Sequence, residues 1–344
     1  MRLWIGLLCI YSISFFACNK EKTVVNRCFY YWQQDFLLSN ETLNTLHSLE
    51  INKLYVKFFD VDWDKALTQP LPVADIHFSS EIPAGIEIIP VVFITNETLL
   101  HLDSTQTILL AQKISKRIQG VIETNKITTP QEIQLDCDWT ETTRGNYFLL
   151  ISTMKNFPDW KNTLWSATIR LHQIKYREQT GIPPVDRGML MFYNMGNIED
   201  ISAENSIYDA ATAELYTKRI NDYPLPLDAA LPCYSWGLLF DGQELMKIFY
   251  PLYPAQVDEK YFTKTSESQY TAKGNFYFRG QFFVEGNILK LETMTPELTL
   301  QAANQLSKEL PAIDRNIILY HLDTIILQNY THENFEKIFD DFKN

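Results

Sequence analysis

The sequence has little positive charge, few cysteines and none of several familiar binding motifs. Its 344 residues include 30 Lys and Arg against 42 Asp and Glu, which gives a net charge of −12. This balance argues against a nucleic-acid or anionic-membrane partner, because both require clustered Lys and Arg. We expect instead a neutral or cationic small ligand, or a neutral polymer.

The sequence also lacks the usual motifs for metals, cofactors and disulfides. Cys28, Cys137 and Cys233 are far apart and lie in strand-like runs, so we expect buried thiols rather than disulfides or reactive groups. No zinc-finger spacing occurs, and neither His172 nor His321 belongs to an H-x-H or H-E-x-x-H motif, so no metal is expected. No glycine-rich phosphate loop is present, and no cofactor is expected.

One apolar run stands out, at the N-terminus. Arg2 precedes an almost wholly apolar stretch at 3–17, which is too short for a membrane span and typical of a secretory signal. The Ala17-Cys18 step resembles the lipobox of bacterial lipoproteins, which implies that Cys18 becomes a lipidated N-terminus in the cell envelope. Residues 18–27 would then be a tether. Phe15 departs from that motif, and plain secretion or an uncleaved anchor are the alternatives.

From residue 28 to 344, short apolar runs alternate with helical patterns, which is typical of parallel βα units. Eight strands are expected, which is the number that closes a (β/α)₈ barrel. An open doubly wound sheet is the competing architecture, and the missing phosphate loop disfavours it. The expected strands are at 28–36, 53–62, 87–95, 132–139, 164–173, 188–195, 229–236 and 316–323.

Helical patterns follow most of these strands, and two segments break the alternation. Residues 65–85 contain Pro70, Pro72 and Pro83, so an irregular loop is expected in place of the second helix. Residues 241–293 are too long for a βα connection, and their run at 277–284 predicts a hairpin, which indicates a β-containing insertion after the seventh strand. The expected helices are at 40–49, 105–124, 144–156, 209–222, 296–310 and 332–342.

Aromatic and polar side chains gather at the ends of the expected strands, where barrel enzymes have their sites. Aromatic faces stack on sugar rings and carboxylates accept hydroxyl protons, so this set predicts a carbohydrate ligand. Misplaced strand ends with ordinary half-buried aromatics are the alternative. The residues expected to bind the ligand are Trp32, Asp35, Asp60, Arg170, His172, Tyr193, Asn194, Tyr234, Trp236 and Asp323.

Three carboxylates near residue 136 are the catalytic candidates. Asp136 and Asp138 share one strand face because side chains alternate along a strand. Paired carboxylates of this kind perform acid–base chemistry in many sugar-cleaving enzymes. Glu141 is off that face and reaches the pocket only if the strand has already turned. A purely structural pair, neutralised by Arg170, is the alternative.

Two patches resemble the family 18 glycoside hydrolases, the chitinase-like barrels. Residues 135–139, L-D-C-D-W, look like part of that family's D-x-x-D-x-D-x-E pattern, and residues 191–194, M-F-Y-N, are similar to its M-x-Y-D. The resemblance implies a carbohydrate-active barrel in which Asp136, Asp138 and Tyr193 match family residues. The chain as a whole also resembles barrel lipoproteins of Bacteroidetes-type bacteria, which implies no reaction.

The departures from the family 18 pattern leave two functions open. Ile133 and Asn194 replace acids of the pattern, and Thr140 stands where the family has its general-acid Glu. One function is a glycosidase in which Asp138 or Glu141 protonates the leaving oxygen. The other is a glycan-binding or structural barrel without a catalytic acid.

Overall fold

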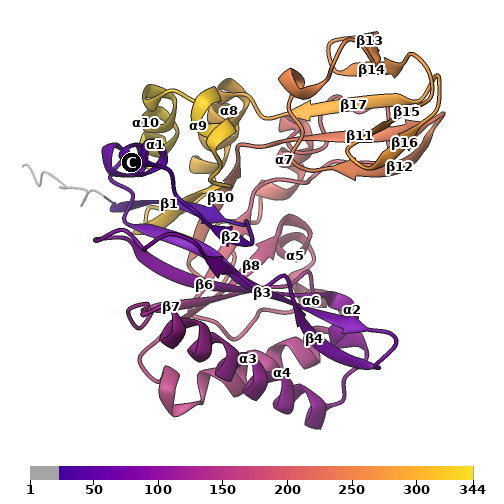
Figure 1. Cartoon of the computed structure of the whole chain (residues 1–344). Coiled ribbons are helices and arrows are strands. Elements are labelled where there is room, and N and C mark those ends of the chain that lie inside the picture. The colour runs from indigo at the N-terminus through magenta and orange to yellow at the C-terminus, as the bar shows by residue number, and fades with distance from the viewer. Residues whose placement is uncertain (1–22, 344) are drawn as a thin grey trace, which may run out of the picture.

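The computed structural model describes residues 23–343, so the expected signal segment, Cys18 and half of the tether lie outside the described residues. Eight parallel strands form a closed barrel (Figure 1), in the order β1, β18, β10, β9, β8, β7, β6 and β3, with β3 pairing back to β1. The predicted (β/α)₈ barrel is confirmed. Its strands are β1 Val25–Tyr31, β3 Lys53–Asp64, β6 Glu87–Ile94, β7 Glu132–Asp136, β8 Leu164–Arg170, β9 Arg187–Met191, β10 Leu227–Pro232 and β18 Arg315–Tyr320.

The barrel strands are continuous buried runs, as expected of parallel strands covered by helices. Several end earlier than the sequence pattern predicts. The β6–β7 ladder ends at the Phe93–Asp136 pair, and the next backbone N–H, that of Cys137, donates to the Thr168 hydroxyl at 3.3 Å. Asp138 therefore lies in the loop after β7.

Helices surround the barrel, and several begin at the caps that the sequence provides (Figure 1). Asp103 and Gln106 form a capping box at the start of α3, and Thr295 caps α8 just before Pro296. No helix among residues 23–343 is long and apolar enough to cross a membrane. The helices are α1 Asn40–Ser48, α2 Asn96–Leu100, α3 Ser104–Thr124, α4 Arg144–Lys155, α5 Leu171–Lys175, α6 Arg177–Thr180, α7 Ala210–Thr217, α8 Pro296–Ser307, α9 Thr324–Asn329 and α10 His332–Asp340.

The second crossover is irregular, as predicted, and is built from strands. β4 Gln69–Val73 pairs antiparallel with the end of β3. β2 Asp35–Phe36 pairs with β5 His77–Phe78. Pro70 and Pro72 are tolerated because β4 is an edge strand, where a missing N–H breaks no ladder.

The β-containing insertion after the seventh barrel strand is also confirmed (Figure 1, orange). Its first strand is β11 Ser235–Asp241, so it begins before residue 241. One face of β11 packs on the main core, and Leu239 on the other face belongs to a second core with Leu289 and Leu291. The remaining strands are β12 Glu244–Phe249, β13 Phe262–Lys264, β14 Gln269–Ala272, β17 Ile288–Thr293 and the hairpin β15 Phe276–Phe278 with β16 Gln281–Phe283.

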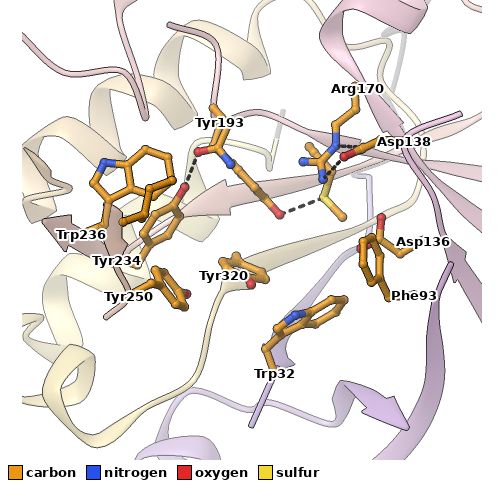
Figure 2. A pocket seen from close by; sticks show the side chains of 13 residues that line it. Trp32, Phe93, Asp136, Asp138, Arg170, Tyr193, Tyr234, Trp236, Tyr250 and Tyr320 are labelled. Atoms are coloured by element: carbon orange, nitrogen blue, oxygen red, sulfur yellow. Dashed lines mark hydrogen bonds and ion pairs between the residues drawn. The ribbon is translucent and has the colours of Figure 1, made fainter. Parts of the chain in front are cut away.

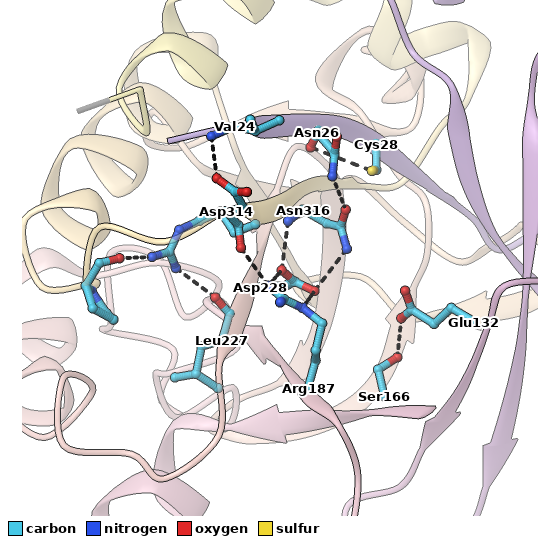
Figure 3. Close-up of polar contacts among 12 residues, drawn as sticks. Val24, Asn26, Cys28, Glu132, Ser166, Arg187, Leu227, Asp228, Asp314 and Asn316 are labelled. Atoms are coloured by element: carbon cyan, nitrogen blue, oxygen red, sulfur yellow. Dashed lines mark hydrogen bonds and ion pairs between the residues drawn. The ribbon is translucent and has the colours of Figure 1, made fainter. Parts of the chain in front are cut away.

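A buried polar network fills the N-terminal end of the barrel (Figure 3). Asp228 is fully buried and accepts two hydrogen bonds from the Arg187 guanidinium, at 2.9 and 2.6 Å. It also accepts from the backbone N–H of Asn316 at 2.7 Å and its side-chain amide at 3.0 Å. Nearby, burial and the Asp228 charge raise the pKa of Glu132 to about 7.

Candidate functional site

A cavity of about 310 Å³ opens at the C-terminal end of the barrel (Figure 2). Its volume is near the lower end of the range of about 300–1,000 Å³ that is usual for small-molecule sites. Residues at the ends of six barrel strands line it, together with side chains from or next to β11 and β12 of the insertion. The lining residues are Trp32, Phe93, Asp136, Asp138, Arg170, Met191, Tyr193, Asn194, Tyr234, Trp236, Ile248, Tyr250 and Tyr320.

The two pocket carboxylates have different surroundings. Asp136 ends β7, is 4% exposed and accepts a hydrogen bond from the Thr168 hydroxyl at 2.6 Å. Burial raises the pKa of Asp136 to about 6, although the Arg170 charge opposes this rise. Asp138 is half exposed and forms an ion pair with the Arg170 guanidinium. The charge of Asp138 is therefore paired with Arg170, whereas the hydrogen bond to the Asp136 side chain comes from a neutral hydroxyl.

Arg170 ends β8 and is the positive charge of the pocket. Burial disfavours its charge, but the Asp138 and Asp136 carboxylates outweigh burial and hold the pKa of Arg170 above its ordinary value. The guanidinium also lies 5.9 Å from the ring centroid of Tyr193. One guanidinium thus faces two carboxylates.

Aromatic rings form most of the remaining wall (Figure 2). Tyr320 is central, with its ring centroid 5.4 Å from Tyr193 and 5.7 Å from both Tyr234 and Trp32. The Tyr234 hydroxyl donates to the Asn194 side-chain oxygen at 2.5 Å. Asn194 follows β9 with φ of 54°, a conformation that Asn adopts more readily than most residues. These contacts fix the rings in one arrangement.

Trp236 lies on β11 of the insertion and not at the end of a barrel strand. It is 8% exposed, and its indole N–H donates to the Glu292 carboxylate at 2.8 Å. Its ring meets Tyr234 edge to face, with centroids 5.7 Å apart. Trp236 is thus mainly a core residue that presents a small part of its surface to the cavity.

The position of the family's catalytic acid has no carboxylate. Thr140 is exposed, and its hydroxyl lies 2.9 Å from that of Thr142 in the turn before α4. Its backbone N–H donates to the Thr143 hydroxyl at 2.9 Å. Glu141 is exposed in the same turn and does not line the pocket. The strand has not turned in the way that would bring Glu141 into the site.

Four further residues expected to bind the ligand are not in this pocket. Asp35 on β2 accepts from the Ser79 hydroxyl at 2.5 Å, and Asp60 forms an ion pair with Lys57 at 2.9 Å. Asp323 caps α9 by accepting from the Ile326 N–H at 2.8 Å. Each of these three carboxylates has a structural role.

The fourth residue, His172, lines a neighbouring cavity of about 290 Å³. Asp138, Arg170, Tyr193 and Asn194 border both cavities. Burial lowers the pKa of His172, partly against the attraction of Asp138. These four side chains form a shared wall between the two cavities.

The structure adds Phe93, Met191, Ile248, Tyr250 and Tyr320 to the site. Tyr320 ends β18, so the rule that selected the other strand ends applies to it equally. Phe93 is directly opposite Asp136 in the β6–β7 ladder, and the alternation of side chains along the strand would have been the signal for it. Ile248 and Tyr250 come from the insertion, and no strand-end rule would find them.

The described residues contain no cluster of three or more His, Cys, Asp and Glu side chains suited to a metal ion. The three thiols at 28, 137 and 233 are buried, and burial raises the pKa of each. These groups are inert in the described structure, since the thiolate is the reactive form.

Comparison with solved structures defines the fold. A spore cortex-lytic enzyme, SleL of Bacillus cereus, is 13% identical with a TM-score of 0.52, over 94% of this chain and 75% of that one. A chitinase of Chromobacterium violaceum is 10% identical with a TM-score of 0.52, over 93% and 99%. The fold is that of the chitinase-like barrels.

A Group IV chitinase of Ostrinia furnacalis, solved with allosamidin, matches this chain with 12% identity and a TM-score of 0.50, over 92% and 97% of the two chains. No family model and no curated protein matches the sequence. At these identities the comparison establishes the barrel fold and no reaction.

Proposed function

We propose that this protein is a lipid-anchored barrel of the cell envelope that binds a carbohydrate without cleaving it. The observation that carries the proposal is the residue at position 140. The resemblance to chitinase-like barrels implies a general-acid Glu there, and this chain has an exposed Thr140 tied into a turn.

The other acids support binding rather than catalysis. Asp138 is held in an ion pair by Arg170, and Glu141 is outside the pocket. Asp136 is the remaining candidate, and it is two residues from Asp138 on the same wall. Most glycosidases place two carboxylates on opposite sides of the scissile bond, about 5–9.5 Å apart, and the family 18 enzymes, whose substrate assists its own cleavage, still use the general acid that is missing at position 140. The pocket offers no second free carboxylate across the cavity.

The aromatic wall supports a sugar as the ligand. Trp32, Tyr193 and Tyr320 present ring surface to the cavity, and apolar sugar faces stack on such surfaces. Asn194 and Arg170 supply polar groups that would fix the orientation of hydroxyl groups. Chitinases among the similar structures point to the same ligand class.

Binding and cleavage are separated by one panel of ligands. The full chain in detergent is titrated by calorimetry with β-1,4-linked trimers of glucose, N-acetylglucosamine and glucosamine, which differ mainly in the group at C2. Each mixture is then incubated and analysed by mass spectrometry for shorter products. We expect binding of at least one trimer and no cleavage. Cleavage of any trimer, or binding of none, would contradict the proposal.

A pair of tryptophan variants provides the control. Trp32→Ala removes a half-buried pocket ring and should weaken binding about five- to thirtyfold, in keeping with about 1–2 kcal/mol for a stacked ring. Trp63→Ala removes a half-buried ring that stacks on His101, with centroids 4.5 Å apart, outside the pocket. The second variant should bind as tightly as the unchanged protein.

The anchor is proposed from residues 1–18 alone, which resemble a lipoprotein signal. Cys18→Ser should abolish incorporation of radioactive palmitate and release the protein from the membrane fraction. Cys28→Ser, which changes a buried thiol, serves as the control and should leave labelling intact. Palmitate incorporation into Cys18→Ser would refute the anchor.

A further inference from the structure

The pocket carries more negative than positive charge. Asp136 and Asp138 line it together with a single guanidinium, that of Arg170. The hydrogen bonds of that guanidinium go to Asp138. The hydrogen bond to the Asp136 side chain comes from the Thr168 hydroxyl, a neutral donor. The ionised Asp136 therefore leaves the cavity with a net charge of about −1.

The walls of the cavity also favour a cation. Seven of the thirteen lining residues are aromatic, and their ring faces carry partial negative charge. A cation within about 6 Å of such a face is attracted, more strongly where water is excluded. Arg170 already uses this attraction at Tyr193, with 5.9 Å to the ring centroid. Lys57, which is paired with Asp60, lies 5.6 Å from the Trp32 ring centroid in the same way. A further, smaller cation would lie near the remaining rings and near Asp136.

We infer that the sugar bound at this site carries a free amine, so that the ligand is an amino sugar whose ammonium group pairs with Asp136 among the pocket rings. This inference rests on the proposed carbohydrate function and narrows its ligand class. A neutral sugar satisfies the rings but leaves Asp136 uncompensated. An acidic sugar would add a third negative charge beside Asp136 and Asp138.

The inference has a pH signature. Asp136 is surrounded by Arg170 and Thr168 on β8, by Asp138 in the loop after β7 and by the more distant Asp60 on β3. The phenol groups near it, on Tyr30, Tyr193 and Tyr320, have raised pKa values and stay neutral below pH 10. Since the pKa of Asp136 is about 6, the carboxylate is mostly protonated at pH 5 and ionised at pH 7. Affinity for an ammonium group should rise over that interval.

The test compares the β-1,4-linked glucosamine trimer with the N-acetylglucosamine trimer, by calorimetry on the full chain in detergent at pH 5 and pH 7. At pH 7 the glucosamine trimer should bind about tenfold more tightly, which corresponds to about 1.4 kcal/mol. The ratio of the two affinities should fall towards one at pH 5. Asp136→Asn should remove the preference at both pH values and retain binding of the N-acetylglucosamine trimer, which reports an intact pocket. Glu141→Gln removes the same charge outside the pocket and should behave like the unchanged protein.

Each outcome has a separate meaning. Equal binding of the two trimers at pH 7 would overturn the amino-sugar inference and leave the carbohydrate function standing. A preference that persists in Asp136→Asn would also overturn it. Binding of no sugar would refute the proposed function itself. If Asp136→Asn does not fold, the pH dependence of the unchanged protein decides. Free choline, an ammonium compound that is not a sugar, is titrated as a further ligand. If choline binds more tightly than the glucosamine trimer, the pocket selects ammonium compounds other than sugars, and the inference is overturned.

Discussion

Asp228 and Asp136 lie at opposite ends of the same barrel and have opposite environments. At the N-terminal end, Asp228 accepts four hydrogen bonds from Arg187 and Asn316 (Figure 3). At the C-terminal end, Asp136 accepts one from Thr168 and lines a cavity. A buried carboxylate whose acceptor sites are filled by the protein stabilises the fold, whereas one that faces a cavity with few donors is available to a ligand.

The largest loss of stability should follow from removing Asp228 at the N-terminal end of the barrel. Asp228→Ala leaves the Arg187 guanidinium and two Asn316 N–H groups without their acceptor. Removing one partner of a buried ion pair costs about 3–5 kcal/mol, and the lost Asn316 bonds place this variant near the upper limit. Urea unfolding would measure the loss. A change below about 1 kcal/mol would mean that the network contributes little.

The next effect concerns Trp236, at the opposite end. Because the residue is 8% exposed and bonded to Glu292, Trp236→Ala should lower the free energy of unfolding by about 3–4 kcal/mol. The cavity beside it can admit water, which keeps the loss below that of the deepest core positions. Loss of glycan binding with an almost unchanged melting temperature would instead make Trp236 a ligand platform, the role that the sequence predicts for it.

Asp136→Asn should stabilise the protein at neutral pH. Burial raises the pKa of Asp136 from 3.8 to about 6, so the folded state binds this proton more tightly than the unfolded state. The stability that this group contributes is complete below about pH 4 and is lost as the pH rises through 6. A difference of that size corresponds to about 3 kcal/mol. Urea unfolding at pH 4 and 7.5 should show a gain for the variant only at the higher pH, and a variant that is less stable at both would contradict this account.

The smallest effect is expected at Glu141. It is exposed in the turn after β7, so Glu141→Gln should change the free energy of unfolding by less than about 0.5 kcal/mol. Ligand affinity should also be unchanged. A tenfold loss of affinity would show that the turn moves towards the pocket in solution. Glu141 would then contact the ligand, as Asp136 is expected to do.

The barrel was predictable because its strands are long buried runs separated by helical patterns. The β6 and β8 runs were placed to within a few residues of their observed ends. The β10 run was extended to Trp236 because apolar character continues past Pro232 into β11. Hydrophobicity alone does not show where a chain leaves one sheet and enters another, since both strands are buried.

The site was predictable mainly where a residue ends a barrel strand or follows that end within a few residues. Asp136, Arg170 and Tyr193 meet in the pocket for this reason. Asp60 is also near the end of a strand, but it forms an ion pair with Lys57, three residues earlier, and does not line the pocket. Tyr250 reaches the pocket through the fold of the insertion, a long-range contact that no local pattern encodes. Local spacing gives the direction of a side chain, but competition between partners decides its role.

The insertion between β10 and α8 supplies one wall of the pocket from a single stretch of chain. Trp236, Ile248 and Tyr250 come from it, and its outer face has a core of its own. Ile248 and Tyr250 are exposed and belong to neither core, so exchanges at these positions can reshape the pocket while the barrel keeps its packing. Descendants of one ancestral barrel could therefore acquire different ligands by changing the few positions of the insertion that face the pocket and lie outside both cores, at a small mutational distance from one another.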